Sequence, residues 1–126
     1  NALKQSGNMI SVTTETLAKS NPDVIIVGSA TTAQARAALK KNAVLSKLKA
    51  VKTNHVYGNP QGTFPWDRYS AEEALQVVWA AQKLQPAQFK QLDMVAKTKA
   101  FYQEFYHYQL STAQTNRLLS GASTPK

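Results

Sequence analysis

Residues 23–29, DVIIVGS, place four consecutive β-branched apolar residues between turn-forming neighbours. A run of this length and composition is typical of a strand buried on both faces of a parallel sheet. Thr31 and Gln34 follow in capping-box spacing, which predicts a helix from there to about Lys41. A buried strand followed by a helix is half of a βαβ unit, so this stretch predicts an α/β fold.

The rest of the chain supplies more helices than strands. The other expected elements are a helix at 12–19, a short strand at 56–57, and helices that begin at Ser70, Asp93 and Ser111. Ser70 and Glu73 stand in capping-box spacing, as do Ser111 and Gln114. The helix after Ser70 is apolar on nearly every side, which predicts burial on more than one face. The helix after Asp93 should gather one apolar face, formed by Met94, Phe101, Tyr102, Phe105 and Tyr108.

These elements predict a Rossmann-like lobe, in which a small parallel sheet is flanked by about five helices. With 126 residues, 43% of them hydrophobic, the chain is long enough for one small domain. We expect this domain to span residues 1–121, with a flexible tail at 122–126. Because a fully apolar strand has few partners here, we also expect that preceding residues of a larger protein supply the rest of the sheet.

The charge of +8, from 15 Lys and Arg against 7 Asp and Glu, raises the question of nucleic-acid binding. The lysines of residues 40–52 are spread over a helix end and the following turns, without interleaved aromatic residues or a recognisable binding module. This distribution favours a solvated basic face, suited to anionic ligands, over a nucleic-acid partner.

Other classes of site are disfavoured by composition. The absence of cysteine excludes disulfides and thiolate metal sites. His55 and His107 lie far apart, with no acidic residue at ligand spacing, so we expect no metal site built by the protein and no cofactor. A metal would arrive inside a chelator or as an oxyanion. No run of 18 or more apolar residues is present, so the chain is not expected to span a membrane.

The loop before the helix at Ser70 is the candidate functional site. It combines residues that interrupt regular structure, Gly58, Pro60, Gly62 and Pro65, with Phe64, Trp66, Asp67, Arg68 and Tyr69. Arg68 could make paired bonds to a carboxylate or oxyanion; the alternative is a local salt bridge to Asp67 or Glu72. Trp66 and Tyr69 could stack on a planar ligand, or could pack onto the following helix.

Four segments carry a family resemblance, in the order VTTETLAKSNPDVIIVG, AVKTNHVYGNP, PWDRYSAEEAL and FYQEFYHYQLSTAQTNRLLSG. Together they resemble the C-terminal lobe of the periplasmic substrate-binding proteins that serve ABC importers of ferric siderophores, haem and vitamin B12, the helical-backbone class. The resemblance spans nearly the whole chain. It implies a bilobal receptor, with two α/β lobes joined by one long helix and a ligand in the cleft between them, although the first lobe and the linking helix are absent here.

The resemblance also implies roles for particular residues. Trp66, Arg68 and Tyr69 fall on the loop that faces the cleft in this family. Glu15 falls on the acidic residue that docks the lobe onto an arginine of the membrane permease. The implied function is capture of a metal chelate (ferric siderophore, haem or corrinoid) or an oxyanion, and its delivery to an ABC permease in the inner membrane. The implied location is the periplasm, or a lipid anchor outside the cytoplasmic membrane.

Two other classes stay open at this stage. An enzyme is disfavoured because the sequence has no nucleophile elbow, no phosphate loop and no paired carboxylates in a plausible cleft, so binding is the expected activity. A helical protein-interaction module without a small ligand is the other alternative. It predicts that Trp66 and Arg68 are exposed on a flat apolar surface.

Overall fold

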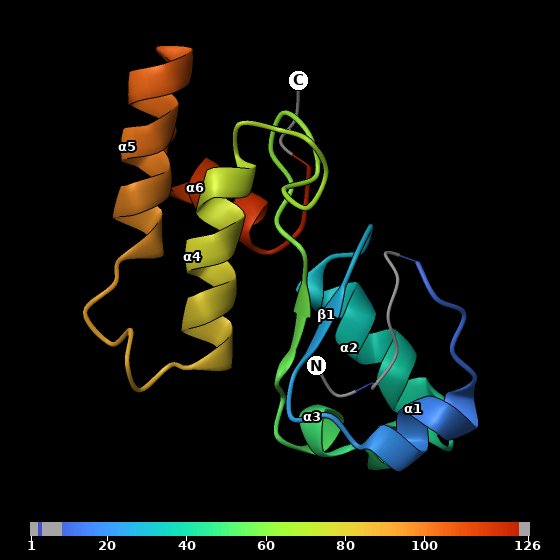
Figure 1. The fold of residues 1–126 in the computed structure, drawn as a ribbon. Coiled ribbons are helices and arrows are strands. Elements are labelled where there is room, and N and C mark those ends of the chain that lie inside the picture. The colour runs from blue at the N-terminus through green and yellow to red at the C-terminus, as the bar shows by residue number, and fades with distance from the viewer. Residues whose placement is uncertain (1–2, 4–8, 124–126) are drawn as a thin grey trace.

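The structure is a computed structural model that describes residue 3 and residues 9–123 (Figure 1). In chain order its elements are α1 (Thr14–Ser20), β1 (Ile25–Val27), α2 (Thr32–Lys41), the 3₁₀ turn η1 (Leu45–Lys47), α3 (Lys49–Lys52), β2 (Val56–Gly58), α4 (Glu73–Leu84), α5 (Met94–Tyr106) and α6 (Thr112–Leu119). The predicted α/β class is therefore confirmed. Most of the tail expected at 122–126 lies outside the described residues.

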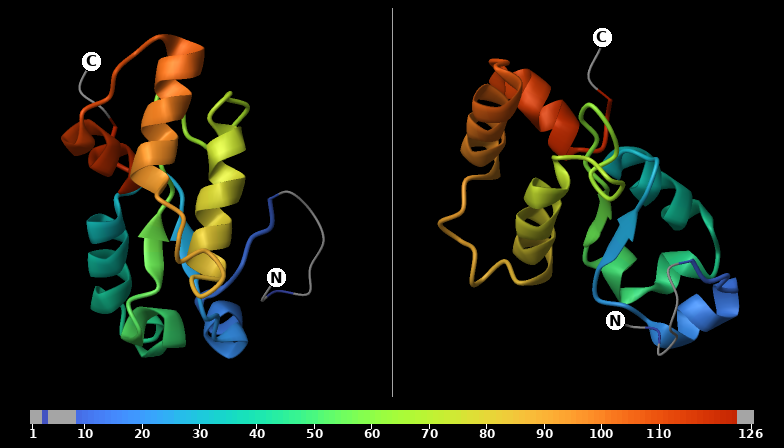
Figure 2. Two further views of the ribbon diagram at one scale, coloured as in Figure 1. Left: turned by 90° about the vertical axis from the view of Figure 1, so that its left-hand side faces the viewer. Right: turned by 45° about the horizontal axis from the view of Figure 1, so that its top comes forward.

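The two described strands form a small parallel sheet, as predicted. Ile25 pairs with Val56 and Ile26 with Tyr57, and the backbone amide of Ile25 donates to the carbonyl of His55 at 3.0 Å. In Figure 2, α2 and α4 lie on opposite sides of this strand pair. α4 covers β2 on its side, because the rings of Tyr57 and Trp79 meet edge to face at 6.3 Å.

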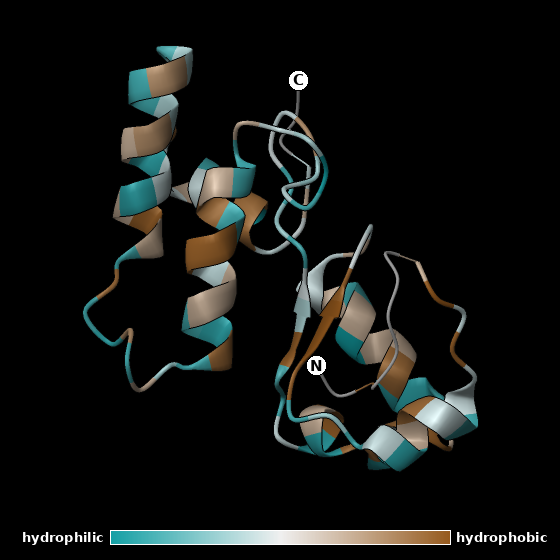
Figure 3. Cartoon of the chain, viewed as in Figure 1, coloured by the Kyte–Doolittle hydropathy of each residue, from teal (hydrophilic) through white to brown (hydrophobic). Residues whose placement is uncertain are grey.

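The prediction that the first strand is buried on both faces is wrong for the described residues. β1 is hydrophobic along its length (Figure 3), but the side chain of Ile26 is 38% exposed. Ile25 and Val27 point to the α2 side and pack against the core there. Ile26 points to the α4 side, where the helix covers β2 and leaves part of β1 uncovered.

The outer edge of β2 is closed by side chains of α2. The Arg36 guanidinium donates to the carbonyls of Val56 at 3.0 Å and Asn54 at 2.8 Å. The Gly58 amide donates to the Thr32 hydroxyl at 2.9 Å. A Cβ atom at Gly58 would meet the backbone of residues 30–32, so this close approach requires glycine. These contacts fix the end of β2, from which the candidate loop leaves.

Local capping signals identify most of the helix starts. The predicted capping boxes at Thr31 and Ser111 are both present. Thr13 and Asp93 also cap their helices, through bonds from the amides three residues later. These side chains satisfy amides that would otherwise lack a partner in the first helical turn.

The capping box predicted at Ser70 and Glu73 is wrong. α4 begins at Glu73 after Glu72, which is already in the right-handed helical region, and no side chain caps the helix. The Glu73 amide donates to the carbonyl of Ser70 at 3.0 Å, while the Ser70 hydroxyl is buried without a hydrogen-bond partner. A backbone turn therefore replaces the side-chain cap.

Burial of the later helices differs in part from the prediction. In α4, Leu75 and Trp79 are buried but Val77 is 68% exposed, so the helix is not covered on several sides within the described chain. In α5, Phe101 packs toward α4 and Tyr102 toward α6. The later aromatic residues Phe105 and Tyr108 are exposed. The helix also ends at Tyr106, because His107 adopts a left-handed conformation (φ 51°).

The core is divided between the two halves of the chain. One buried cluster lies between the sheet and α2 and consists of Ala35, Leu48, Ala50, Val51 and Val56. A second cluster lies between the loop and the later helices and consists of Trp66, Leu75, Trp79 and Met94. No helix within the described residues is long and apolar enough to cross a membrane.

Candidate functional site

The candidate site is the loop of residues 59–72, which joins β2 to α4. It leaves the carboxyl end of β2 and lies at the top of the view in Figure 1. In α/β sheets, ligands bind beyond the carboxyl ends of parallel strands. The backbone also ties the loop to the last helix, because the Gln61 amide donates to the carbonyl of Leu118 at 3.2 Å.

Trp66 is the hydrophobic anchor of this loop. Its side chain is 0% exposed and packs with Leu75, Trp79 and Met94, and its amide donates to the carbonyl of Pro60 at 3.1 Å. A buried ring has no free face on which a solute could stack. The structure therefore places Trp66 in the core against the following helix, which is the packing alternative of the sequence analysis, and not at the loop surface.

Glu72 is a buried carboxylate that sequence reasoning did not select as a site residue. Its side chain is 0% exposed and accepts from the Thr63 amide at 3.1 Å, the Thr63 hydroxyl at 2.7 Å and the Phe64 amide at 3.4 Å. It also accepts a hydrogen bond from the Tyr102 hydroxyl of α5. The sequence signal was weak, since an acid beside a helix start is common and its α5 partner lies 30 residues away.

Gly62 makes room for this cluster. A Cβ atom at Gly62 would collide with the Glu72 carboxylate and the Tyr102 hydroxyl, so the close approach of the turn to both groups requires a residue without a side chain. Burial, together with the hydrogen bond to Glu72, raises the pKa of the Tyr102 phenol well above its usual range. Tyr102 is therefore a protonated donor at neutral pH.

Arg68 is exposed at the tip of the loop. Its amide donates to the carbonyl of Pro65 at 3.1 Å. Within the described part of the chain, its guanidinium makes no hydrogen bond or ion pair. The local salt bridge considered as an alternative is not formed, because Asp67 accepts from the Asn59 amide group at 3.0 Å and Glu72 faces the turn at Thr63. The charge of Arg68 is thus available to a ligand.

Tyr69 is 99% exposed and adopts a left-handed backbone conformation (φ 47°). This conformation is unfavourable for a bulky residue. Arg68 and Tyr69 are brought together at one exposed tip, whereas Trp66 points into the core beneath them.

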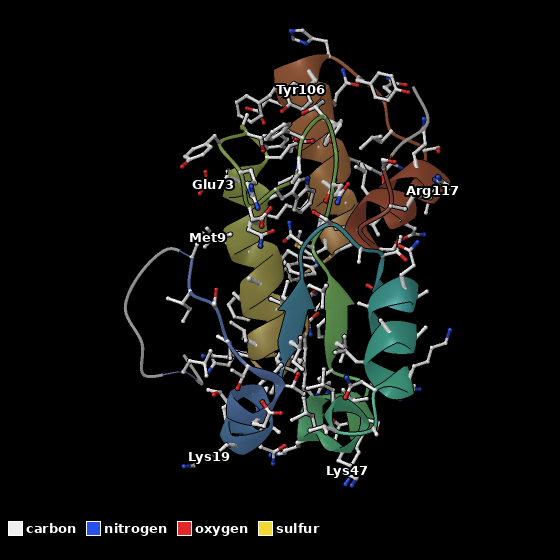
Figure 4. All side chains as sticks on the ribbon, turned by 90° about the vertical axis from the view of Figure 1, so that its right-hand side faces the viewer. Met9, Lys19, Lys47, Glu73, Tyr106 and Arg117 are labelled. Atoms are coloured by element: carbon white, nitrogen blue, oxygen red, sulfur yellow. The ribbon has the colours of Figure 1, made fainter. Side chains whose placement is uncertain are left out.

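Glu15 lies elsewhere on the molecule. It is exposed in the first turn of α1, after the Thr13 cap. Figure 4 shows Lys19 of α1 at the lower end of the molecule, and Glu73, which directly follows the loop, in the upper half. The residue predicted to dock a permease is therefore on an element away from the loop.

A hollow of about 860 Å³ opens away from the loop, beside the outer edge of β1. Its lining is largely aliphatic and includes Leu17, Ile26 and Leu84. The charged residue in this lining is Asp23, whose carboxylate is paired with Lys49, so we place the candidate site at the loop, where no described residue pairs with the Arg68 guanidinium. No cluster of three or more His, Cys, Asp or Glu residues that could hold a metal ion occurs in residue 3 and residues 9–123.

The structure is thus a parallel α/β unit with an exposed cationic and aromatic loop beyond a strand end, the position at which α/β sheets bind ligands. A sequence model of the family described as "Periplasmic binding protein" matches residues 1–63, half of the chain. The chain belongs to this family.

A solved structure agrees with this assignment. The chain is similar to a periplasmic solute binding protein from Veillonella parvula DSM 2008, with a TM-score of 0.79 and 29% sequence identity. The similarity covers 94% of this chain and 36% of that protein, so the chain spans about a third of its length. A comparison with curated proteins gave no match. The lobe-like character of the fold, predicted from the sequence, is confirmed.

Proposed function

We propose that this chain forms one lobe of a solute receptor for an ABC importer, and that the tip of the loop at Arg68 and Tyr69 contacts the solute in a cleft between two lobes. The observation that carries the proposal is the guanidinium of Arg68, which has no partner within the described residues and lies on the segment between two buried loop residues, Trp66 and Glu72. A fixed loop loses little conformational entropy when it binds, so an arginine presented in this way is suited to recognition.

The chemistry of the loop tip favours an anionic solute with a planar or apolar surface. A guanidinium can make two parallel hydrogen bonds to a carboxylate or an oxyanion. The exposed ring of Tyr69 offers an aromatic face beside it. Ferric siderophores, haem, corrinoids and simple oxyanions such as molybdate combine these features to different degrees, and we propose that the cargo belongs to this group.

We further propose that the receptor works in the periplasm, free or attached by a lipid outside the cytoplasmic membrane, and that Glu15 contacts an arginine of the permease. The support is the exposure of Glu15 at the start of α1, where a carboxylate is available for a partner. An acidic residue in a first helical turn is also stabilised by the helix dipole without any partner. If Glu15 contacts the permease, reversing its charge should lower the rate of transport and leave solute affinity unchanged. If Glu15 only stabilises its helix, the transport rate should not change.

The test is calorimetric titration of the full-length protein with a ferric catecholate siderophore, haemin, cobalamin and molybdate, repeated with Arg68→Ala. Binding of one solute that weakens tenfold or more in the variant, about 1.4 kcal/mol, would support the proposal. Arg117→Ala is the matched control, because Arg117 is exposed on α6 and, among the residues that the structure describes, its guanidinium donates only to the nearby carbonyl of Ser123. Binding that is indifferent to Arg68, or no binding of any of the four solutes, would refute the proposed site or cargo class.

A further inference from the structure

Glu72 is the one charged residue among the buried residues of the described structure. Its carboxylate has no exposed surface, and within the described residues it forms no ion pair. Burying an unpaired carboxylate is costly unless hydrogen bonds replace its water shell. Four donors do so here: two groups of Thr63, the Phe64 amide and the Tyr102 hydroxyl. The start of α4 adds a favourable dipole.

These donors belong to separate parts of the fold. Thr63 and Phe64 form the turn of the loop, in which the Gly62 amide donates to the Phe64 carbonyl at 3.1 Å. Tyr102 lies in the middle of α5, and Glu72 itself precedes α4. One carboxylate therefore joins the loop turn to two helices.

The contacts of Glu72 lie next in the chain to the exposed tip formed by Arg68 and Tyr69. Trp66 is buried on one side of Arg68 and Tyr69, and Glu72 is buried on the other. The segment between these two fixed residues is short, so its tip has little freedom as long as both ends hold. Release of Glu72 would free the turn at Thr63 and Phe64 and one end of the tip together.

We propose that Glu72 is a positioning residue for solute binding: its carboxylate holds the turn at Thr63 and Phe64 against α4 and α5, and thereby fixes Arg68 and Tyr69 in the geometry that binds the solute. This inference rests on the proposed function of the loop. It assigns a binding role to a residue that cannot itself touch the solute.

The test uses the full-length protein and its Glu72→Gln variant, which keeps the side-chain shape but replaces one acceptor oxygen by an amide group that cannot accept. The amides of Thr63 and Phe64 should exchange with deuterium at least tenfold faster in the variant. Affinity for whichever of ferric catecholate siderophore, haemin, cobalamin or molybdate binds the natural protein should fall about tenfold, measured well below the unfolding temperature.

Thr63→Val is the second variant, because Thr63 is exposed and the change removes only its hydroxyl donor. The other three donors, the Thr63 amide, the Phe64 amide and the Tyr102 hydroxyl, still bind the Glu72 carboxylate. It should fold normally and show a smaller change in the same direction in both measurements. Glu73→Gln, which removes an exposed acid next in the chain, should change neither. Val51→Ala weakens the other core cluster, so it should lower thermal stability and leave affinity unchanged.

Three results would overturn the inference. Unchanged exchange at Thr63 and Phe64 in Glu72→Gln would show that the carboxylate does not hold the turn. Faster exchange with unchanged affinity would show that the turn has no part in binding. If none of the four solutes binds the natural protein, the proposed function fails first, and the role of Glu72 in binding fails with it. Failure of the proposed function is thus seen in the natural protein, and failure of the inference alone only in the variants.

Discussion

Replacing Trp66 by alanine should lower the free energy of unfolding by about 3–5 kcal/mol, the usual cost of deleting a fully buried aromatic side chain. The side chain is 0% exposed and packs with Leu75, Trp79 and Met94, so its removal leaves a cavity between the loop and two helices. The indole NH has no hydrogen-bond partner, so the loss should come from packing alone. Trp66→Phe should therefore cost much less, about 1–2 kcal/mol.

Tyr69 provides a matched control three positions along the same loop. Its ring is 99% exposed, so Tyr69→Ala should change stability by no more than about 0.5 kcal/mol. Urea unfolding of the full-length protein, followed by far-ultraviolet circular dichroism, avoids the change in tryptophan emission that Trp66→Ala itself causes. A loss below about 1 kcal/mol for Trp66→Ala, or similar losses for both variants, would refute the assignment of Trp66 as the loop anchor.

Two further predictions test the local structure. Ser111→Ala should lower the free energy of unfolding by about 1 kcal/mol, because the Ser111 hydroxyl caps α6. Ser70→Ala should be neutral or slightly stabilising, because the buried Ser70 hydroxyl has no partner. Equal losses of stability in urea unfolding would contradict this difference. Stability should also fall as the pH rises above about 10, where the unfolded state loses the Tyr102 proton that the folded state keeps. The slope of unfolding free energy against pH above 10 should be shallower in Tyr102→Phe, and an identical slope in variant and natural protein would count against the raised pKa.

Some features of the fold could be predicted because the interactions that specify them are local. A cap at Thr31 or Ser111 joins atoms three residues apart, so the sequence alone specifies both partners. The apolar run at 23–29 predicted a parallel strand correctly, although its length and burial depended on which neighbours cover it.

The loop shows where local reasoning fails. Ser70 and Glu73 have the spacing of a capping box, but Glu72 lies between them with its carboxylate directed at Thr63 and Tyr102. That arrangement brings the backbone of Glu72 into the helical region and leaves the Ser70 hydroxyl unused. Spacing predicts only that a bond is possible; competition from a distant partner decides whether it forms.

The sequence by itself determined the order of two strands and five of the helices, though not η1 or α3, as well as the caps that begin four helices and the family to which the chain belongs. These features depend on neighbouring residues or on the linear order of segments. Only the tertiary structure decided that Trp66 is buried while Arg68 and Tyr69 are exposed, because burial depends on which helices lie over a loop. The hydrogen bond between Glu72 and Tyr102, residues far apart in the chain, could likewise be known only from the tertiary structure. Contacts between residues far apart in the chain are set by packing, and no local pattern encodes them.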